Sequence, residues 1–161
     1  MKYSKVKYHV EEDDSLQTDI KGYNIDLDWC RLTPEGVLTA KRHFSCDGPS
    51  GPTIDSEWTI RPAVYHDIVD KLIRMGLLPI TWKPYSDGLF YMQLLKDCRI
   101  YYKNESMDLP KMLRPVYLST NLTIMERRAW LWYLAVCNCS DDAYKPENEN
   151  PIYETPKEMA A

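Results

Sequence analysis

A chain of 161 residues suits a single domain that buries its own hydrophobic core without disulfides or a structural metal. The net charge of −4, from 20 basic and 24 acidic residues, lacks the basic excess that phosphate binding requires, so we expect no nucleic-acid partner. No apolar run can span a bilayer and no secretion signal follows the charged N-terminus. We therefore expect synthesis in a cytoplasm and no membrane partner.

The aromatic and cysteine residues further limit the kinds of protein that this chain could be. With 12 Tyr, 5 Trp and 2 Phe, the aromatic rings suit either a protein interface or a core whose polar ring tips reach water. The five cysteines are an odd number without a C-x-x-C pair, which argues against a disulfide framework and a zinc ribbon. Buried free thiols are the expected state.

The N-terminal third is predicted to form strands. Residues 1–10 alternate loosely, as an edge strand does, and a polar loop is expected over 11–19. The turn residues in the segment TPEG, from Thr33 to Gly36, predict a type I turn. Apolar residues alternate on both sides of this turn, so an antiparallel hairpin is predicted over 24–32 and 37–44.

Three helical stretches are predicted after the hairpin. The first begins at Pro62, ends before Gly76 and carries one broad apolar face. The second covers about residues 86–98. The third begins at Thr123 as the N-cap of a capping box, because a glutamate follows three positions later. The segment 99–119 stays undetermined and could hold a short strand or an irregular excursion.

These elements predict an α+β fold, with a small antiparallel sheet packed on about three helices. Residues 1–139 would form a single domain. Residues 140–161 are polar and poor in aliphatic side chains, so we expect a polar C-terminal arm there, as a flexible tail or an extended arm.

Polar residues that could share a site flank the start of the first predicted helix. The sequence HFSCDGPSGP carries Asp47 and Ser50, and His66 and Asp67 follow as a pair. Neighbouring helical residues point about 100° apart, so His66 would lie at the edge of the apolar face and Asp67 on the polar face. Asp87 lies in the first turn of the second predicted helix. We expect it to be a partly buried carboxylate whose negative charge is stabilised by the helix N-terminus.

Two interpretations of this set remain open. Asp47, Ser50, His66, Asp67 and Asp87 could form a hydrogen-bonded structural network, since buried polar groups need partners. Alternatively, Asp47, His66 and Asp87 could bind zinc or manganese, with Asp67 as an outer group or base, because carboxylates and imidazole suit these metals.

The order of short motifs resembles a small family of phage and prophage proteins catalogued as domain of unknown function 1353. The resemblance covers about residues 44–136 and four blocks. It is carried by Phe44, Asp47, Ser50 and Pro52, then Ala63, His66 and Asp67, then Asp87 and Phe90, and finally Arg127 or Arg128. Cys46, Pro49 and Ser86 depart from the usual Thr, small residue and Ala. The N-terminal strands and the C-terminal arm lie outside the matched region.

The resemblance implies a bacteriophage setting, often among late structural and tail genes, without implying a mechanism. We therefore expect a non-enzymatic virion protein of the tail, neck or baseplate, made in the host bacterial cytoplasm and without a cofactor. Its partners would be other virion proteins in a symmetric multi-subunit assembly, bound through its surface and terminal arms. The alternative is a metal-dependent hydrolase of cell wall or a phosphoester, and a third possibility is a host-directed binding protein made early in infection.

Overall fold

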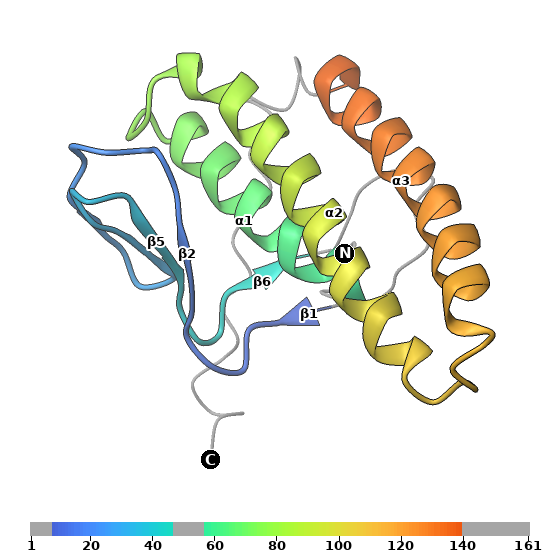
Figure 1. Cartoon of the computed structure of the whole chain (residues 1–161). Helices are drawn as coiled ribbons and strands as arrows, with labels where there is room; N and C mark the ends of the chain where they lie inside the picture. The colour runs from blue at the N-terminus through green and yellow to red at the C-terminus, as the bar shows by residue number, and fades with distance from the viewer. Residues whose placement is uncertain (1–7, 47–56, 140–161) are drawn as a thin grey trace, which may run out of the picture.

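A computed structural model describes residues 8–46 and 57–139, in which short strands precede three long helices (Figure 1). The α+β class is confirmed. The strands are β1 (Tyr8–His9), β2 (Asp14–Gln17), β3 (Ile25–Asp26), β4 (Cys30–Leu32), β5 (Val37–Ala40) and β6 (Ser45–Cys46). The helices are α1 (Glu57–Arg74), the short 3-10 helix η1 (Ile80–Trp82), α2 (Lys83–Ser106) and α3 (Arg114–Cys139). None of the helices in the described ranges has the length and apolar character needed to cross a membrane.

The predicted turn and the strands beside it form the centre of a four-stranded antiparallel sheet of order β2-β5-β4-β3. Leu32 of β4 faces Leu38 of β5, and Gly36 donates a backbone hydrogen bond of 2.9 Å to Thr33 in the turn. Gly36 has φ of +88°, and an added Cβ would lie 2.5 Å from the Thr18 carbonyl oxygen. Only glycine satisfies both conditions, so the turn residue fixes the hairpin.

Three strand predictions need correction. The segment 37–44 is a strand only as far as Ala40, where β5 ends. The segment 24–32 is not one strand, because a tight turn in which the Leu27 N–H donates to the Cys30 carbonyl separates β3 from β4. The segment 11–19 is not simply a loop, because it contains β2. Leu16 is the one apolar side chain of this strand and is buried, whereas Ser15 and Gln17 are exposed. A single apolar residue between two polar ones is too weak an alternation to predict an edge strand.

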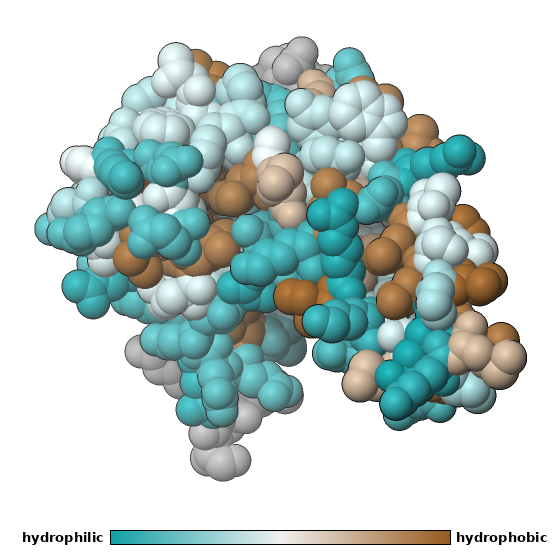
Figure 2. All heavy atoms as spheres, in the orientation of Figure 1, coloured by the Kyte–Doolittle hydropathy of each residue, from teal (hydrophilic) through white to brown (hydrophobic). Residues whose placement is uncertain are grey.

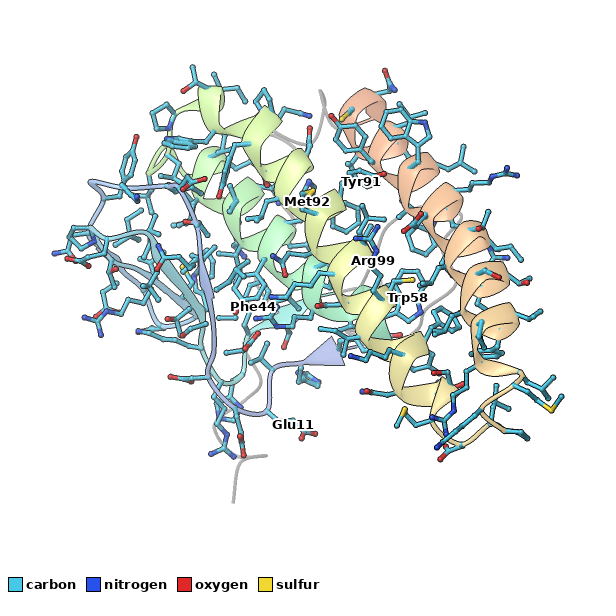
Figure 3. The ribbon with its side chains drawn as sticks, in the orientation of Figure 1. Glu11, Phe44, Trp58, Tyr91, Met92 and Arg99 are labelled. Atoms are coloured by element: carbon cyan, nitrogen blue, oxygen red, sulfur yellow. The ribbon has the colours of Figure 1, made fainter. Side chains whose placement is uncertain are left out.

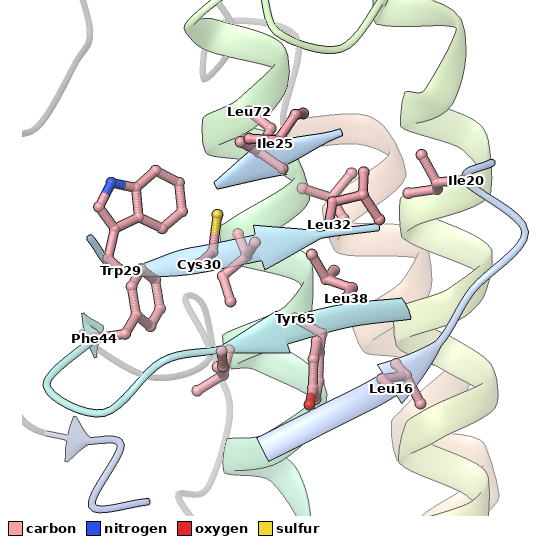
Figure 4. Close-up of a cluster of buried hydrophobic side chains, with 14 of the residues drawn as sticks. Leu16, Ile20, Ile25, Trp29, Cys30, Leu32, Leu38, Phe44, Tyr65 and Leu72 are labelled. Atoms are coloured by element: carbon pink, nitrogen blue, oxygen red, sulfur yellow. The ribbon is translucent and has the colours of Figure 1, made fainter. Parts of the chain in front are cut away.

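The first core lies between the sheet and α1, as Figure 4 shows. Ile68, Val69 and Leu72 of α1 are fully buried against side chains of the sheet. These include Leu16, Ile25, Cys30, Leu32 and Leu38, with Trp29 and Phe44 at one end. The predicted apolar face of α1 is thus largely confirmed, but Met75 at its end is 43% exposed.

The second core joins α1, α2 and α3 away from the sheet (Figure 3). Trp58 stacks on Trp132 with ring centroids 5.6 Å apart. Phe90 and Leu94 of α2 and Ala129 of α3 complete its centre. Because α2 lies between α1 and α3, α3 is the outermost helix (Figure 1).

All three helices are longer than predicted, for a common physical reason. α1 begins at Glu57 instead of Pro62, because the buried Trp58 and Thr59 continue it upstream of the proline. The segment 99–119 is mostly helix, since α2 runs to Ser106 and α3 begins at Arg114. Tertiary packing has overridden the local end signals.

The predicted capping box is wrong. Thr123 lies inside α3, where its hydroxyl donates a 2.7 Å hydrogen bond to the Ser119 carbonyl. Its partner Glu126 instead accepts hydrogen bonds from Arg99 of α2. A Thr and a Glu three residues apart can therefore lie in the interior of a helix as well as in a capping box at its start.

We predict that Trp132→Ala destabilises the fold by about 3–5 kcal/mol, because it removes a buried ring and leaves a cavity. The matched variant Trp130→Ala, at a position 48% exposed on the same helix, should cost about 1 kcal/mol, the value of its ring contacts. Urea unfolding of both variants checks this. Equal losses for the two would mean that α3 is not packed through Trp132.

Candidate functional site

A buried polar cluster lies between α1 and α2 and is centred on Asp87. One Asp87 oxygen is 2.9 Å from His66 Nε2, and the other accepts a 2.7 Å hydrogen bond from Lys83 Nζ. His66 is 9% exposed and Asp87 is 2% exposed. The structure thus brings together two of the residues that the sequence singled out, and adds Lys83. Asp47 and Ser50 lie outside the described residues.

Local helix geometry places each of these groups. Lys83 and Asp87 are one turn apart on α2, so their side chains meet on one face. Asp70 lies one turn after His66 on α1, with its Oδ2 3.6 Å from His66 Nδ1. Ser86 of α2 donates a 3.4 Å hydrogen bond to the other Asp70 oxygen. Both helices therefore contribute a carboxylate and a donor to one closed network.

The electrostatics of the cluster favour the ionised forms of its central pair. Burial alone would lower the pKa of His66, but the hydrogen bond to Asp87 and the charges of Asp70 and Asp67 outweigh it and raise this pKa. Burial alone would raise the pKa of Asp87, yet the hydrogen bonds from His66 and Lys83 lower it. Opposite charges at hydrogen-bond distance thus prevail over desolvation.

Two positional expectations change. The charge of Asp87 is not stabilised by a helix N-terminus, because α2 already begins at Lys83. The Lys83 ammonium supplies the balancing positive charge instead. Asp67 is half-buried and acts on His66 through its charge, while Asp70, one turn from His66, lies closer to the ring. Lys83 and Asp70 were not among the residues predicted for the site. Asp70 could have been found from its spacing of four residues from His66 within the first predicted helix. Lys83 could not, because the second helix was predicted to begin at residue 86.

The cysteines near the helices do not supply a reactive thiolate. Burial raises the pKa of Cys30 to about 12 and that of Cys98 to about 11. Burial and the charge of Asp87 raise the pKa of Cys137 on α3, against a hydrogen bond with Tyr133. A thiol must ionise to act as a nucleophile, so these three groups are poorly suited to that chemistry. The expectation of buried free thiols is confirmed for Cys30 and Cys98.

A metal site is not found in the part of the chain that the structure describes. Within residues 8–46 and 57–139, no group of three or more His, Cys, Asp or Glu side chains is arranged to hold a metal ion. The Lys83 ammonium lies 2.7 Å from Asp87, on the side where a cation would bind. A metal there would have to displace this charge.

A second polar cluster, which the sequence analysis missed, ties the sheet to α1. Arg61 donates a 2.7 Å hydrogen bond to Asp14 of β2 through Nε, and Tyr65 donates a 2.9 Å hydrogen bond to the same oxygen. The guanidinium lies over the Tyr65 ring at 5.1 Å and also reaches Gln93 of α2. Because Asp14 fell in a predicted loop, its role as a strand anchor could not be recognised.

Comparison with known proteins gives no further assignment, since no protein-family model, no curated protein and no solved structure matches the chain.

We predict that Asp87→Asn destabilises the fold by about 3–5 kcal/mol, because it removes the anion shared by the buried His66 and the partly buried Lys83. Asp67→Asn removes a carboxylate from the neighbouring, half-buried position and should cost about 1 kcal/mol or less. Free energies of unfolding in urea compare the two variants. A harmless Asp87→Asn would show that the cluster does not hold α1 against α2.

The cluster also predicts a pH dependence of stability. The raised pKa of His66 gives a contribution that is complete below its ordinary value of 6.5 and is lost as the pH rises through the folded pKa. The lowered pKa of Asp87 gives a contribution that is present above its ordinary value of 3.8 and is lost as the pH falls through the folded pKa. Stability from this pair should therefore be greatest between these limits.

Urea unfolding over a pH series, for the wild type and His66→Gln, measures this contribution. The wild type should lose stability above pH 6.5, and the variant should lack that loss because its side chain does not titrate. Parallel curves for the two proteins would contradict an ionised His66 in the fold.

Proposed function

We propose that this protein is a non-enzymatic structural subunit of a bacteriophage virion, associated with the tail, neck or baseplate. It would be made in the host bacterial cytoplasm and bind neighbouring virion proteins in a symmetric assembly. The phage setting follows from the motif resemblance over about residues 44–136. The observation that carries the structural role is the apolar outer surface of α3.

We define the α3 outer face by its exposed residues Val116, Ile124, Arg127, Trp130, Leu131 and Leu134. Val116 is 66% exposed and Leu131 is 62% exposed, although both are aliphatic. Hydrophobic side chains are visible along α3 at the right of the molecule in Figure 2. Three to four residues separate most neighbours in this set, so they share one side of the helix.

The position of Trp130 on this face is fixed by neighbouring aromatic rings. Its ring centroid lies 5.8 Å from that of Tyr91 on α2 and 5.4 Å from that of Tyr133 on α3. The packing leaves one side of the ring exposed while holding its orientation. Exposed apolar side chains gathered on one helix side, with an aromatic ring held in place among them, are typical of protein interaction sites.

The buried cluster around Asp87 supports a structural role over an enzymatic one. Its two carboxylates are each bound by groups of the protein, and His66 is buried against Phe90 at 5.2 Å between ring centroids. A general acid or base must reach its substrate. The hydrolase alternative would need Asp47, whose position is outside the described residues, and the displacement of Lys83 by a metal.

Quantitative mass spectrometry of purified particles of the source phage tests the proposal. We expect a fixed copy number that matches a rotational symmetry of the virion, because closed assemblies repeat their subunits by symmetry. A major capsid protein of known copy number serves as the internal standard. Absence of the chain from intact particles would overturn the structural role and redirect attention to the infected cell.

A further inference from the structure

The α3 outer face contains a cation among its apolar side chains. Thr123, Glu126, Arg127, Trp130 and Leu131 line a shallow hollow on this face. Glu126 is bound to Arg99 of α2 at 2.6 Å. In residues 8–46 and 57–139, no ion-pair partner is found for the exposed Arg127. The hollow therefore offers an apolar floor and a positive charge to an incoming group.

The charge of α3 disfavours a second α3 as the occupant. The helix carries Arg114, Arg127 and Arg128 against the single acid Glu126. In an antiparallel pair of copies, the midpoint of the face from Val116 to Leu134 is residue 125. Two Arg127 side chains would then lie close to the two-fold axis, and like charges across an interface oppose association. An acidic occupant with apolar anchors fits this face better.

The C-terminal segment, residues 140–161, has that chemistry. It carries six acids and two lysines, a net charge of −4, at Asp141, Asp142, Glu147, Glu149, Glu154 and Glu158 against Lys145 and Lys157. Between these charges it has apolar side chains that could enter the hollow, including Tyr144, Ile152 and Tyr153. Opposite charge would steer the segment to α3, and the rings would supply apolar contact.

The length of the segment allows it to reach this face, and its composition favours a neighbouring copy over the same chain as the source. From residue 140 the segment has 22 residues, an extended reach of about 70 Å at ~3.1 Å per residue. The face from Val116 to Leu134 is about 27 Å long at ~1.5 Å per residue. The segment contains no glycine and has prolines at 146, 151 and 156. Prolines favour an extended course, and the lack of glycine disfavours an abrupt reversal onto the same helix.

We propose that the α3 outer face is the docking site for the acidic C-terminal segment 140–161 of a neighbouring copy of this chain. This inference rests on the proposed structural function and assigns its contact surface. Arg127 pairs with acids of the segment, and the hollow beside Trp130 and Leu131 receives an apolar side chain.

Photo-cross-linking of the full-length protein tests this inference. The photoreactive residue p-benzoylphenylalanine replaces Leu131 in one variant and Met92 in the control. Met92 is 60% exposed but lies on α2 (Figure 3). Cross-linked peptides are identified by mass spectrometry over a series of protein concentrations, in a mixture of isotopically light and heavy chains. We expect position 131 to cross-link to peptides of 140–161 in light–heavy pairs, with a yield that rises with concentration, and position 92 not to do so.

Adding Arg127→Glu to the Leu131 variant should lower the yield about fivefold, the effect of losing roughly one favourable charge pair. Lys111→Glu, an exposed position before the N-terminus of α3, is the matched charge reversal and should leave the yield unchanged. Cross-links within one chain, cross-links to another α3, or equal effects of the two reversals would overturn the docking site. Particle copy number is measured separately, so a chain present in particles without these cross-links would refute the docking site and not the structural role.

Discussion

The arrangement of the helices depends on one buried carboxylate. Asp87 accepts from His66 of α1 with one oxygen and from Lys83 of α2 with the other, at 2.9 Å and 2.7 Å. An unpaired charge at this depth would be strongly destabilising, so the cost is offset only where both partners are in place. This requirement fixes the rotation of α1 against α2. It thereby also fixes which side of each helix faces the second core and which side of α2 receives α3.

The same helix α1 must satisfy a second constraint on its other side. Ile68, Val69 and Leu72 are fully buried against the sheet, but the hydrophobic effect is non-directional and leaves some freedom in the position of the helix. Arg61 removes this freedom, because it binds Asp14 of β2 and reaches Gln93 of α2. The short strands are thus held to the helices by directed polar contacts as well as by burial. α1 transmits the position of the sheet to α2 and, through α2, to α3.

The sequence predicts those features that depend on a few neighbouring residues. The turn from Thr33 to Gly36 was recognisable because its chemistry is local, and helical periodicity placed His66 at the edge of the apolar face. Helix starts were not recognisable, since Pro62 and Thr123 carry start signals that packing overrides, whereas the end of α1 before Gly76 was recognised. This error hid the partner of Asp87. Lys83 lies outside a helix begun at residue 86, so its pairing one turn from Asp87 could not be derived.

The aromatic rings, which on sequence grounds suited either a core or an interface, are divided within α3 between the core and the exposed surface. Trp132 is 6% exposed and stacks on Trp58, whereas Trp130, two residues earlier, is 48% exposed and stands on Tyr91 and Tyr133. The Trp132 ring is held by the packing of α3 on the other helices, which the Asp87 cluster stabilises. Because Trp130 lies on the same helix, this packing also fixes the position of its ring. A stable interior is therefore the condition for a preorganised outer face. The buried network around Asp87 and the exposed apolar side chains of α3 are therefore linked through one continuous packing of the three helices.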